Sequence, residues 1–158
     1  MTSKISEGVE ISVETFYQQD YSNPMLSEYM FAYRITIENH NSFPVKLHSR
    51  HWYIFDSNGE YREVEGEGVV GVQPTISSGD NYQYVSGCNL KSEMGRMHGT
   101  YVMENLDTQQ QFEVNIPSFA YCNSKGNTAG PSRGESSQTP INQAWFQFSQ
   151  IIQTDGRN

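Results

Sequence analysis

The run Phe31-Ala32-Tyr33-Arg34-Ile35-Thr36-Ile37-Glu38 decides the fold of this chain. Its large apolar side chains fall on odd positions, while Arg34, Thr36 and Glu38 fall on even ones. Successive side chains of a strand point to opposite faces, so this period of two predicts a half-buried β-strand. β-Branched and aromatic residues dominate the run, and these residue types favour strands over helices.

Further segments on either side of this run carry the same alternation or the same strand-forming composition. They span residues 9–15, 45–55, 61–69, 82–88, 98–104 and 111–116. Turn-forming sequences separate them, such as Asp56-Ser57-Asn58-Gly59, because Asn and Gly tolerate the positive φ of tight hairpin turns. No segment with helical periodicity interrupts residues 8–121. The pattern predicts an all-β fold, an immunoglobulin- or fibronectin-III-like antiparallel β-sandwich of about seven strands.

Length and charge restrict the classes of function. The chain has 158 residues, which suits one domain, and a formal net charge of −8. An acidic surface repels phosphate backbones and anionic lipid headgroups, so neither nucleic acid nor a membrane is expected as a partner. The sequence shows no secretory signal and no apolar run of about 18 residues. We expect a cytoplasmic protein whose two cysteines, Cys88 and Cys122, are reduced thiols.

Composition changes after Tyr121, and this change sets the predicted domain boundaries. Residues 1–122 are expected to form the β-sandwich. Residues 123–138 are rich in Ser, Gly, Thr, Asn and Gln, and are expected to be a flexible linker. Residues 139–158 form a C-terminal tail that begins with a Thr-Pro pair, as many helices do. This tail is expected to contain a short amphipathic helix and to be dispensable for folding. Its apolar face would consist of Ala144, Trp145, Phe148, Ile151 and Ile152.

The segment Gly66-Glu67-Gly68-Val69-Val70-Gly71 matches the GxGxxG pattern of dinucleotide-binding sites. Such a site needs a helix directly after the glycines, because the helix N-terminus holds the pyrophosphate. Here Pro74 follows among β-branched residues and does not open a helix. We therefore expect no nucleotide cofactor. Two interpretations of Gly66, Gly68 and Gly71 stay open: a bend where two backbones approach, or a nest of N–H groups that binds a small anion.

The third predicted strand changes its alternation around Ser49-Arg50-His51-Trp52. Apolar residues occupy odd positions before this point and even positions after it. A single-residue bulge would place both sets on the core face, and it would turn Arg50 and His51 outward from a rigid strand. These two residues are our candidates for contacting a partner. The alternative is that Arg50 only pairs with a neighbouring carboxylate on the sheet surface, such as Glu63 or Glu65.

The remaining charged residues do not form a recognisable catalytic or metal-binding pattern. Glu63, Glu65 and Glu67 alternate and therefore share one strand face, which we interpret as a solvated acidic face. Mg²⁺ or Ca²⁺ would require several convergent oxygens. The histidines lack the HxH or HExxH spacing of metal sites, and no Ser/His/Asp or Cys/His set can be identified. The sequence thus predicts no catalytic residues, no metal ligands and no cofactor.

Five runs of the chain share their order and spacing with one known family, namely residues 31–39, 49–52, 66–74, 86–88 and 116–119. Together they resemble the ApaG family. The resemblance covers about residues 8–121 and implies an immunoglobulin- or fibronectin-III-like sandwich, in agreement with the strand pattern. It brings no established catalytic residues. Bacterial members are associated with divalent-cation homeostasis, including cobalt and magnesium, and similar eukaryotic domains look like protein-binding modules. The tail beyond residue 138 departs from the family pattern.

We therefore expect a non-catalytic binding module for a protein partner, with the link to cobalt and magnesium homeostasis that the resemblance implies. The partner would contact Arg50, His51 and the glycine loop. The alternative is a small anion or a nucleotide phosphate, bound by the loop from Gly66 to Gly71. A third hypothesis is a cation-responsive protein that acts through the acidic face. The sequence specifies neither the identity of the partner nor the oligomeric state.

Overall fold

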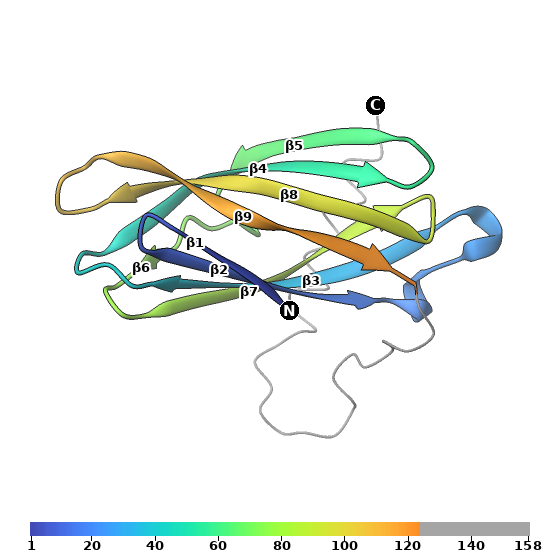
Figure 1. Cartoon of the computed structure of the whole chain (residues 1–158), viewed down its shortest axis with the longest axis horizontal. Coiled ribbons are helices and arrows are strands. Elements are labelled where there is room, and N and C mark those ends of the chain that lie inside the picture. The colour runs from blue at the N-terminus through green and yellow to red at the C-terminus, as the bar shows by residue number, and fades with distance from the viewer. Residues whose placement is uncertain (124–158) are drawn as a thin grey trace, which may run out of the picture.

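The computed structural model describes residues 1–123. Within this range the chain forms β-strands and two single-turn 3-10 helices, but no α-helix (Figure 1). No helix in the described range is long and apolar enough to span a membrane. The predicted linker at 123–138 and the predicted tail at 139–158 lie outside the described residues, apart from Asn123. The elements are β1 (Thr2–Ser6), β2 (Val9–Tyr17), η1 (Gln19–Tyr21), η2 (Pro24–Leu26), β3 (Tyr29–Asn39), β4 (Val45–Asp56), β5 (Tyr61–Glu67), β6 (Thr75–Ile76), β7 (Asn81–Leu90), β8 (Met94–Asn105) and β9 (Gln111–Cys122).

Two antiparallel sheets pack face to face. One has the strand order β1-β2-β3-β7, and the other has the order β5-β4-β8-β9, with β6 paired to β4. The predicted all-β antiparallel sandwich is therefore confirmed, and all seven predicted strands are present. β1 and β6 were not predicted. β1 is almost entirely exposed and β6 has two residues, so neither carries a readable alternation.

The odd-numbered residues of β3 point between the sheets, as the alternation predicts. Phe31, Tyr33, Ile35 and Ile37 are all buried there. They face apolar residues of the other sheet, such as Tyr101 on β8. Burial of this apolar surface is the main term that stabilises the sandwich.

The predicted bulge in β4 is present, and it lies at His48. The register between β4 and β8 shifts between Leu47 and Ser49. Because of this extra residue, Leu47 before the bulge and Trp52 after it are both buried in the core. Every even-numbered residue from Arg50 to Ile54 consequently faces inward.

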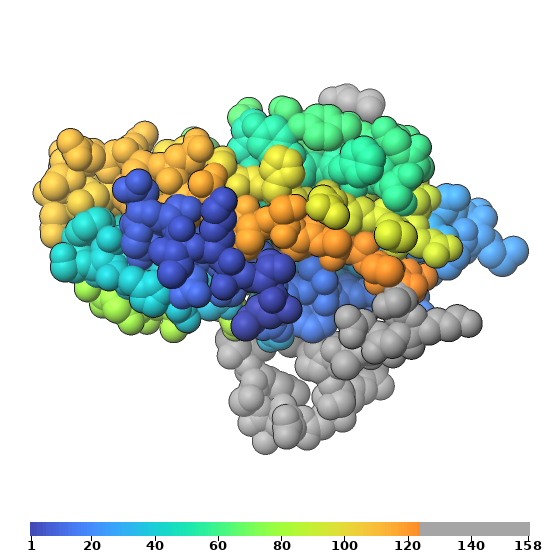
Figure 2. All heavy atoms as spheres, in the orientation of Figure 1, coloured from blue at the N-terminus to red at the C-terminus, as the bar shows by residue number. Residues whose placement is uncertain are grey.

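The two long sides of the sandwich differ. On one side β1 and β9 lie against each other, as Figure 2 shows, and the Asn115 N–H donates a hydrogen bond of 3.2 Å to the Ser6 hydroxyl. On the other side β5 and β7 end their sheets. Nothing in the described chain pairs with their outer edges. The candidate functional site lies between these two edge strands.

Candidate functional site

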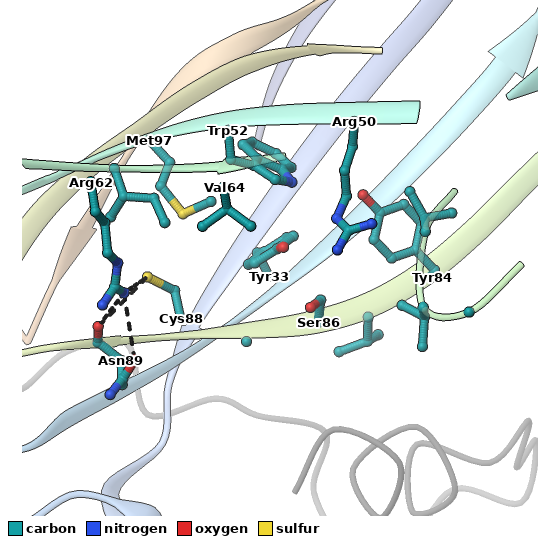
Figure 3. A pocket seen from close by; sticks show the side chains of 16 residues that line it. Tyr33, Arg50, Trp52, Arg62, Val64, Tyr84, Ser86, Cys88, Asn89 and Met97 are labelled. Atoms are coloured by element: carbon teal, nitrogen blue, oxygen red, sulfur yellow. Dashed lines mark hydrogen bonds between the residues drawn. The ribbon is translucent and has the colours of Figure 1, made fainter. Parts of the chain in front are cut away.

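A pocket of about 520 Å³ opens between the two sheets at the β5 and β7 edge. This volume is in the range of small-molecule and side-chain binding pockets. Figure 3 shows the pocket from close by, with Arg50 at one end and Arg62 at the other. Its lining comes from β3, β4, β5, β7 and β8 and from the glycine loop. Among the residues that line it are Tyr33, Trp52, Val64, Tyr84, Ser86 and Cys88.

Arg50 points into this pocket, and the prediction that it would stand out beside His51 is wrong. The bulge lies at His48, so Arg50 has the same parity as Trp52 and faces inward. Its Nη1 donates two hydrogen bonds of 3.0 Å, to the carbonyl oxygens of Glu67 and Gly68. The side chain therefore fastens the start of the glycine loop to β4.

His51 lies on the opposite, outer face of β4. Its ring nitrogens are 2.7 Å from Glu65 and 3.4 Å from Glu63, and its ring stacks on Tyr53 at 4.4 Å. The alternative prediction, that Arg50 pairs with Glu63 or Glu65, is therefore also wrong, because those carboxylates meet His51. The shared outer face of these glutamates is confirmed.

Two glycines of the motif allow close contacts, one with the Arg50 side chain and one with backbone. A Cβ atom on Gly66 would lie 2.8 Å from Arg50 Nη1, and one on Gly68 would lie 2.1 Å from the Val72 carbonyl oxygen. Gly71 adopts a φ of +77° in a tight turn, where Val69 and Val72 exchange backbone hydrogen bonds of 2.8 and 3.1 Å. A strand, β6, follows the motif, as expected from Pro74. The predicted close approach of two backbones is therefore present at Gly68.

Three backbone N–H groups of this loop donate hydrogen bonds within the protein. The N–H of Gly68 donates to the His48 carbonyl at 2.8 Å, and those of Val69 and Val72 donate within the turn. An anion-binding nest needs successive N–H groups that point outward together. The cation beside this loop in the pocket is the Arg50 guanidinium, which β4 carries.

Arg62 is a site residue that the sequence reading missed. It lies on the inward face of β5, opposite Ile54 of β4. Its Nη2 donates hydrogen bonds to the Asn89 carbonyl at 2.6 Å and to the Cys88 sulfur at 3.3 Å. The signal was available, because outward-facing Glu63 and Glu65 place Arg62 and Val64 on the other face of the same strand.

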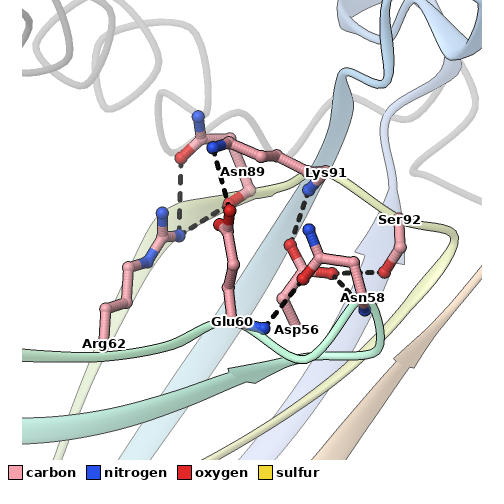
Figure 4. Close-up of polar contacts among 7 residues, drawn as sticks. All are labelled: Asp56, Asn58, Glu60, Arg62, Asn89, Lys91 and Ser92. Carbon is pink, nitrogen blue, oxygen red and sulfur yellow. Dashed lines mark hydrogen bonds and ion pairs between the residues drawn. The ribbon is translucent and has the colours of Figure 1, made fainter.

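A polar network holds the Arg62 end of the pocket (Figure 4). The buried carboxylate of Asp56 accepts hydrogen bonds from the Lys91 N–H at 2.7 Å and from the Ser92 hydroxyl. Lys91 also forms an ion pair of 3.2 Å with Glu60. The β4–β5 hairpin is thereby tied to the end of β7, which fixes the spacing of the two strands that carry the pocket.

Both arginines of the pocket lack an acidic counterpart. In the described range Arg34 pairs with Glu14 at 2.8 Å and Lys91 pairs with Glu60. No ion pair to a carboxylate involves Arg50 or Arg62 in that range, although the whole chain has a net charge of −8. The pocket is a local concentration of positive charge on an acidic protein, a combination that attracts anionic groups.

Aromatic residues form the floor between the two cations. Trp52 packs edge-on against Tyr33 at a centroid distance of 5.4 Å, and the hydroxyls of Tyr84 and Tyr101 lie 2.5 Å apart. Burial raises the pKa of Tyr33 to about 12, while a hydrogen bond from Ser86 and the charge of Arg50 oppose this rise. Burial likewise raises the pKa values of Tyr84, Tyr101 and Tyr121.

These four tyrosines should stay protonated until the protein unfolds in alkali. A folded-state pKa above the unfolded value adds stability that is complete below about pH 10 and is lost as pH rises toward 12. We expect the tyrosinate absorbance of four of the ten tyrosines to rise in one cooperative step, together with loss of the β circular dichroism. Ionisation of all ten with an unchanged dichroism spectrum would contradict this expectation.

One further group of polar side chains gathers outside the pocket. Ligand atoms of Glu10, Glu38 and His40 lie within 4.8 Å of one another. The His40 ring bonds Glu10 at 2.9 Å, and this hydrogen bond is the main cause that lowers the pKa of Glu10. The His40 ring also lies 3.4 Å from the Glu38 carboxylate, so these two contacts alone explain why the three groups are close together.

Known proteins resemble this chain over most of its length. Residues 19–105 match the sequence profile of the ApaG domain. Protein ApaG of Brucella canis is 47% identical over 120 residues, which cover 76% of this chain and 92% of the relative. A crystal structure assigned to ApaA of Bordetella pertussis has a TM-score of 0.70 and 38% identity, and covers 72% of this chain and 92% of that one. A second solved structure has a TM-score of 0.70 and 34% identity, with coverages of 87% and 99%. The chain belongs to the ApaG family.

Proposed function

We propose that the protein is a non-catalytic binding module that recognises a partner protein at the pocket between β5 and β7. The observation that carries this proposal is the pair of guanidinium groups, without carboxylate partners, at the two ends of an open pocket with an aromatic floor. Arginine and aromatic side chains are also the residue types that most often dominate binding energy at protein interfaces.

The chemistry of the pocket supports a role without catalysis. The lining contains arginines, tyrosines and one thiol, Cys88. Burial raises the pKa of Cys88 to about 11, and Arg62 opposes this rise. A thiol with that pKa is protonated near neutral pH and is a poor nucleophile. None of the described histidines lines the pocket, so the lining offers no group poised to act as a general base.

The proposal includes a cytoplasmic location. Cys88 and Cys122 are both free thiols, and Cys122 is exposed. Exposed free thiols persist in reducing compartments, where disulfides rarely form.

The competing function is binding of a small anion or a nucleotide phosphate. Arg50 favours it, because a guanidinium fork suits a carboxylate or a phosphate. Two features favour a protein partner. Arg62 on β5 lies at the opposite end of the pocket from Arg50 on β4, and the unpaired edges of β5 and β7 border the pocket.

A substitution at the pocket mouth tests the proposal. Val64 lies in the mouth on β5 with 38% of its surface exposed, so Val64→Trp should fill the opening and leave the fold intact. Val72→Trp is the matched control, since Val72 is 46% exposed and does not line the pocket. Peptides selected from a random display library on the wild-type protein are then measured against both variants.

We expect Val64→Trp to weaken the selected peptides more than about tenfold, while Val72→Trp changes affinity by less than about threefold. Peptides that bind both folded variants like the wild type would place the interaction surface elsewhere and overturn the proposal.

A further inference from the structure

The two arginines of the pocket are spaced as residues i and i+4 of a strand. In the β4–β5 register Arg50 lies opposite Gly66, and Arg62 lies opposite Ile54. Arg62 is thus four residues from the partner of Arg50, on the same inward face. At about 3.3 Å per residue this places the two strand positions about 13 Å apart. Between them the register pairs Trp52 with Val64, so the order along the strands is cation, apolar, cation.

An extended peptide carries the complementary order at the same spacing. Side chains at i, i+2 and i+4 of a strand share one face and repeat with the same rise per residue. Acidic residues at i and i+4 therefore meet both arginines, while an apolar residue at i+2 faces the middle of the pocket. A guanidinium–carboxylate contact at each arginine, made by the N–H groups that its carbonyl and sulfur partners leave free, would fix the register of such a segment.

The edges beside the pocket can hold the backbone of that peptide. In the described part of the chain β5 pairs only with β4, and β7 pairs only with β3. An unpaired strand edge presents N–H and C=O groups to an incoming strand, which is the basis of β-augmentation.

The outer face of β5 restricts which residues the peptide can carry at i+1 and i+3. Glu63, Glu65 and Glu67 are exposed on that face. Side chains at i+1 and i+3 of a strand added to β5 would lie beside these carboxylates. Like charges on adjacent strands are destabilising, so acidic residues at i+1 and i+3 would oppose binding.

We propose that the pocket binds an extended segment of a partner protein with acidic residues at i and i+4, an apolar residue at i+2, and neutral or basic residues between them. This rests on the proposed function and names the chemistry of the partner. The protein's own residues beyond 123 do not supply the motif, since their only acidic residues are Glu135 and Asp155, twenty positions apart.

The probe is a fluorescein-labelled peptide Ser-Glu-Thr-Val-Thr-Glu-Ser, capped at both ends, measured by fluorescence anisotropy with the full-length protein. Three comparison peptides replace both Glu by Gln, move the second Glu one position closer, or place Glu at the two Thr positions. Arg50→Gln and Arg62→Gln test the cations. Arg96→Gln is the matched control, because Arg96 is exposed on β8 and lies outside the pocket lining.

We expect each comparison peptide to bind at least about fivefold more weakly than the probe, and each pocket variant to lose about tenfold, the equivalent of 1.4 kcal/mol. Arg96→Gln should stay within about twofold. Raising the salt from about 50 to about 200 mM should weaken the probe and leave the Gln peptide unaffected. Because Arg50→Gln also removes hydrogen bonds to the loop, Arg50→Lys is measured as a second variant of this residue. Lysine keeps the charge but lacks the fork, and should recover only part of the affinity.

Other outcomes overturn this inference, and they show whether the proposed function fails with it. If the Gln peptide binds as tightly as the probe, and Val64→Trp blocks both, the pocket binds peptides without reading acidic residues. If the probe does not bind, but library-selected peptides do so in a Val64-dependent manner, the partner has another chemistry. If acetate or inorganic phosphate displaces the probe when the anion is only as concentrated as the probe, the ligand is a small anion. If binding ignores both Val64→Trp and the arginine variants, the inference and the proposed function fail together.

Discussion

Replacing Gly99 with alanine is expected to lower the free energy of unfolding by about 3 kcal/mol or more, in the range of severe core overpacking. Gly99 is buried on β8, directly opposite Trp52. An added Cβ would lie 2.1 Å from the His51 carbonyl oxygen and 3.2 Å from the Trp52 ring. Neither neighbour can move easily, because one is backbone in a paired strand and the other is the floor of the pocket.

Urea denaturation of the wild type and the variant measures this loss. Gly66→Ala is the control, because its added Cβ meets only the end of the Arg50 side chain, at 2.8 Å from Nη1. A flexible side chain can swing away, so we expect Gly66→Ala to cost about 1 kcal/mol or less. Equal stabilities of Gly99→Ala and the wild type would mean that β4 and β8 are farther apart at this point than in the structure.

The fold follows from the sequence because its strands alternate clearly. In β3 each odd position from Phe31 to Ile37 is apolar. A shift of one residue would expose all of these side chains, so their burial favours a single pairing register. The bulge in β4 could be predicted for the same reason, since only an extra residue brings both Leu47 and Trp52 into the core. β1 was not predicted, because its residues are almost all exposed and need not alternate between apolar and polar.

The site was harder to predict for two reasons. It depends on whether the odd or the even positions of β4 face inward, and on the distance between the two sheets. The sequence restricts the bulge to a few residues, yet a bulge at His48 and one at His51 send Arg50 to opposite faces. Arg62 lies thirty-five residues before Met97 in sequence, although both line one pocket. How far β5 stands from β7 is set by the contacts of Asp56 with Lys91 and Ser92, and such contacts leave no periodic signal.

Replacing Asn39 with aspartate is expected to destabilise the protein by about 3 kcal/mol or more at neutral pH, as for an uncompensated buried charge. Asn39 is fully buried at the end of β3. Its Nδ2 donates hydrogen bonds to the carbonyl oxygens of Phe43 at 2.8 Å and Ile76 at 3.1 Å, and its Oδ1 accepts one from the Asn41 N–H at 3.1 Å. A carboxylate there would place negative charge against two carbonyl oxygens, and the bonds that hold β6 beside the β3–β4 turn would be lost.

The loss should depend on pH in a direction that identifies its cause. Burial and the two carbonyl oxygens favour the neutral carboxyl, so its folded-state pKa would lie above the unfolded value of about 3.9. The folded variant then binds more protons than the unfolded one, and its stability relative to the wild type must rise as pH falls toward 4. Urea denaturation of both proteins at several pH values measures this difference. Asn39→Ser is the control, since it loses the same amide without adding a charge, and its deficit should not vary with pH. A deficit for Asn39→Asp that stays constant from neutral pH to about pH 4 would show that water reaches the introduced carboxylate.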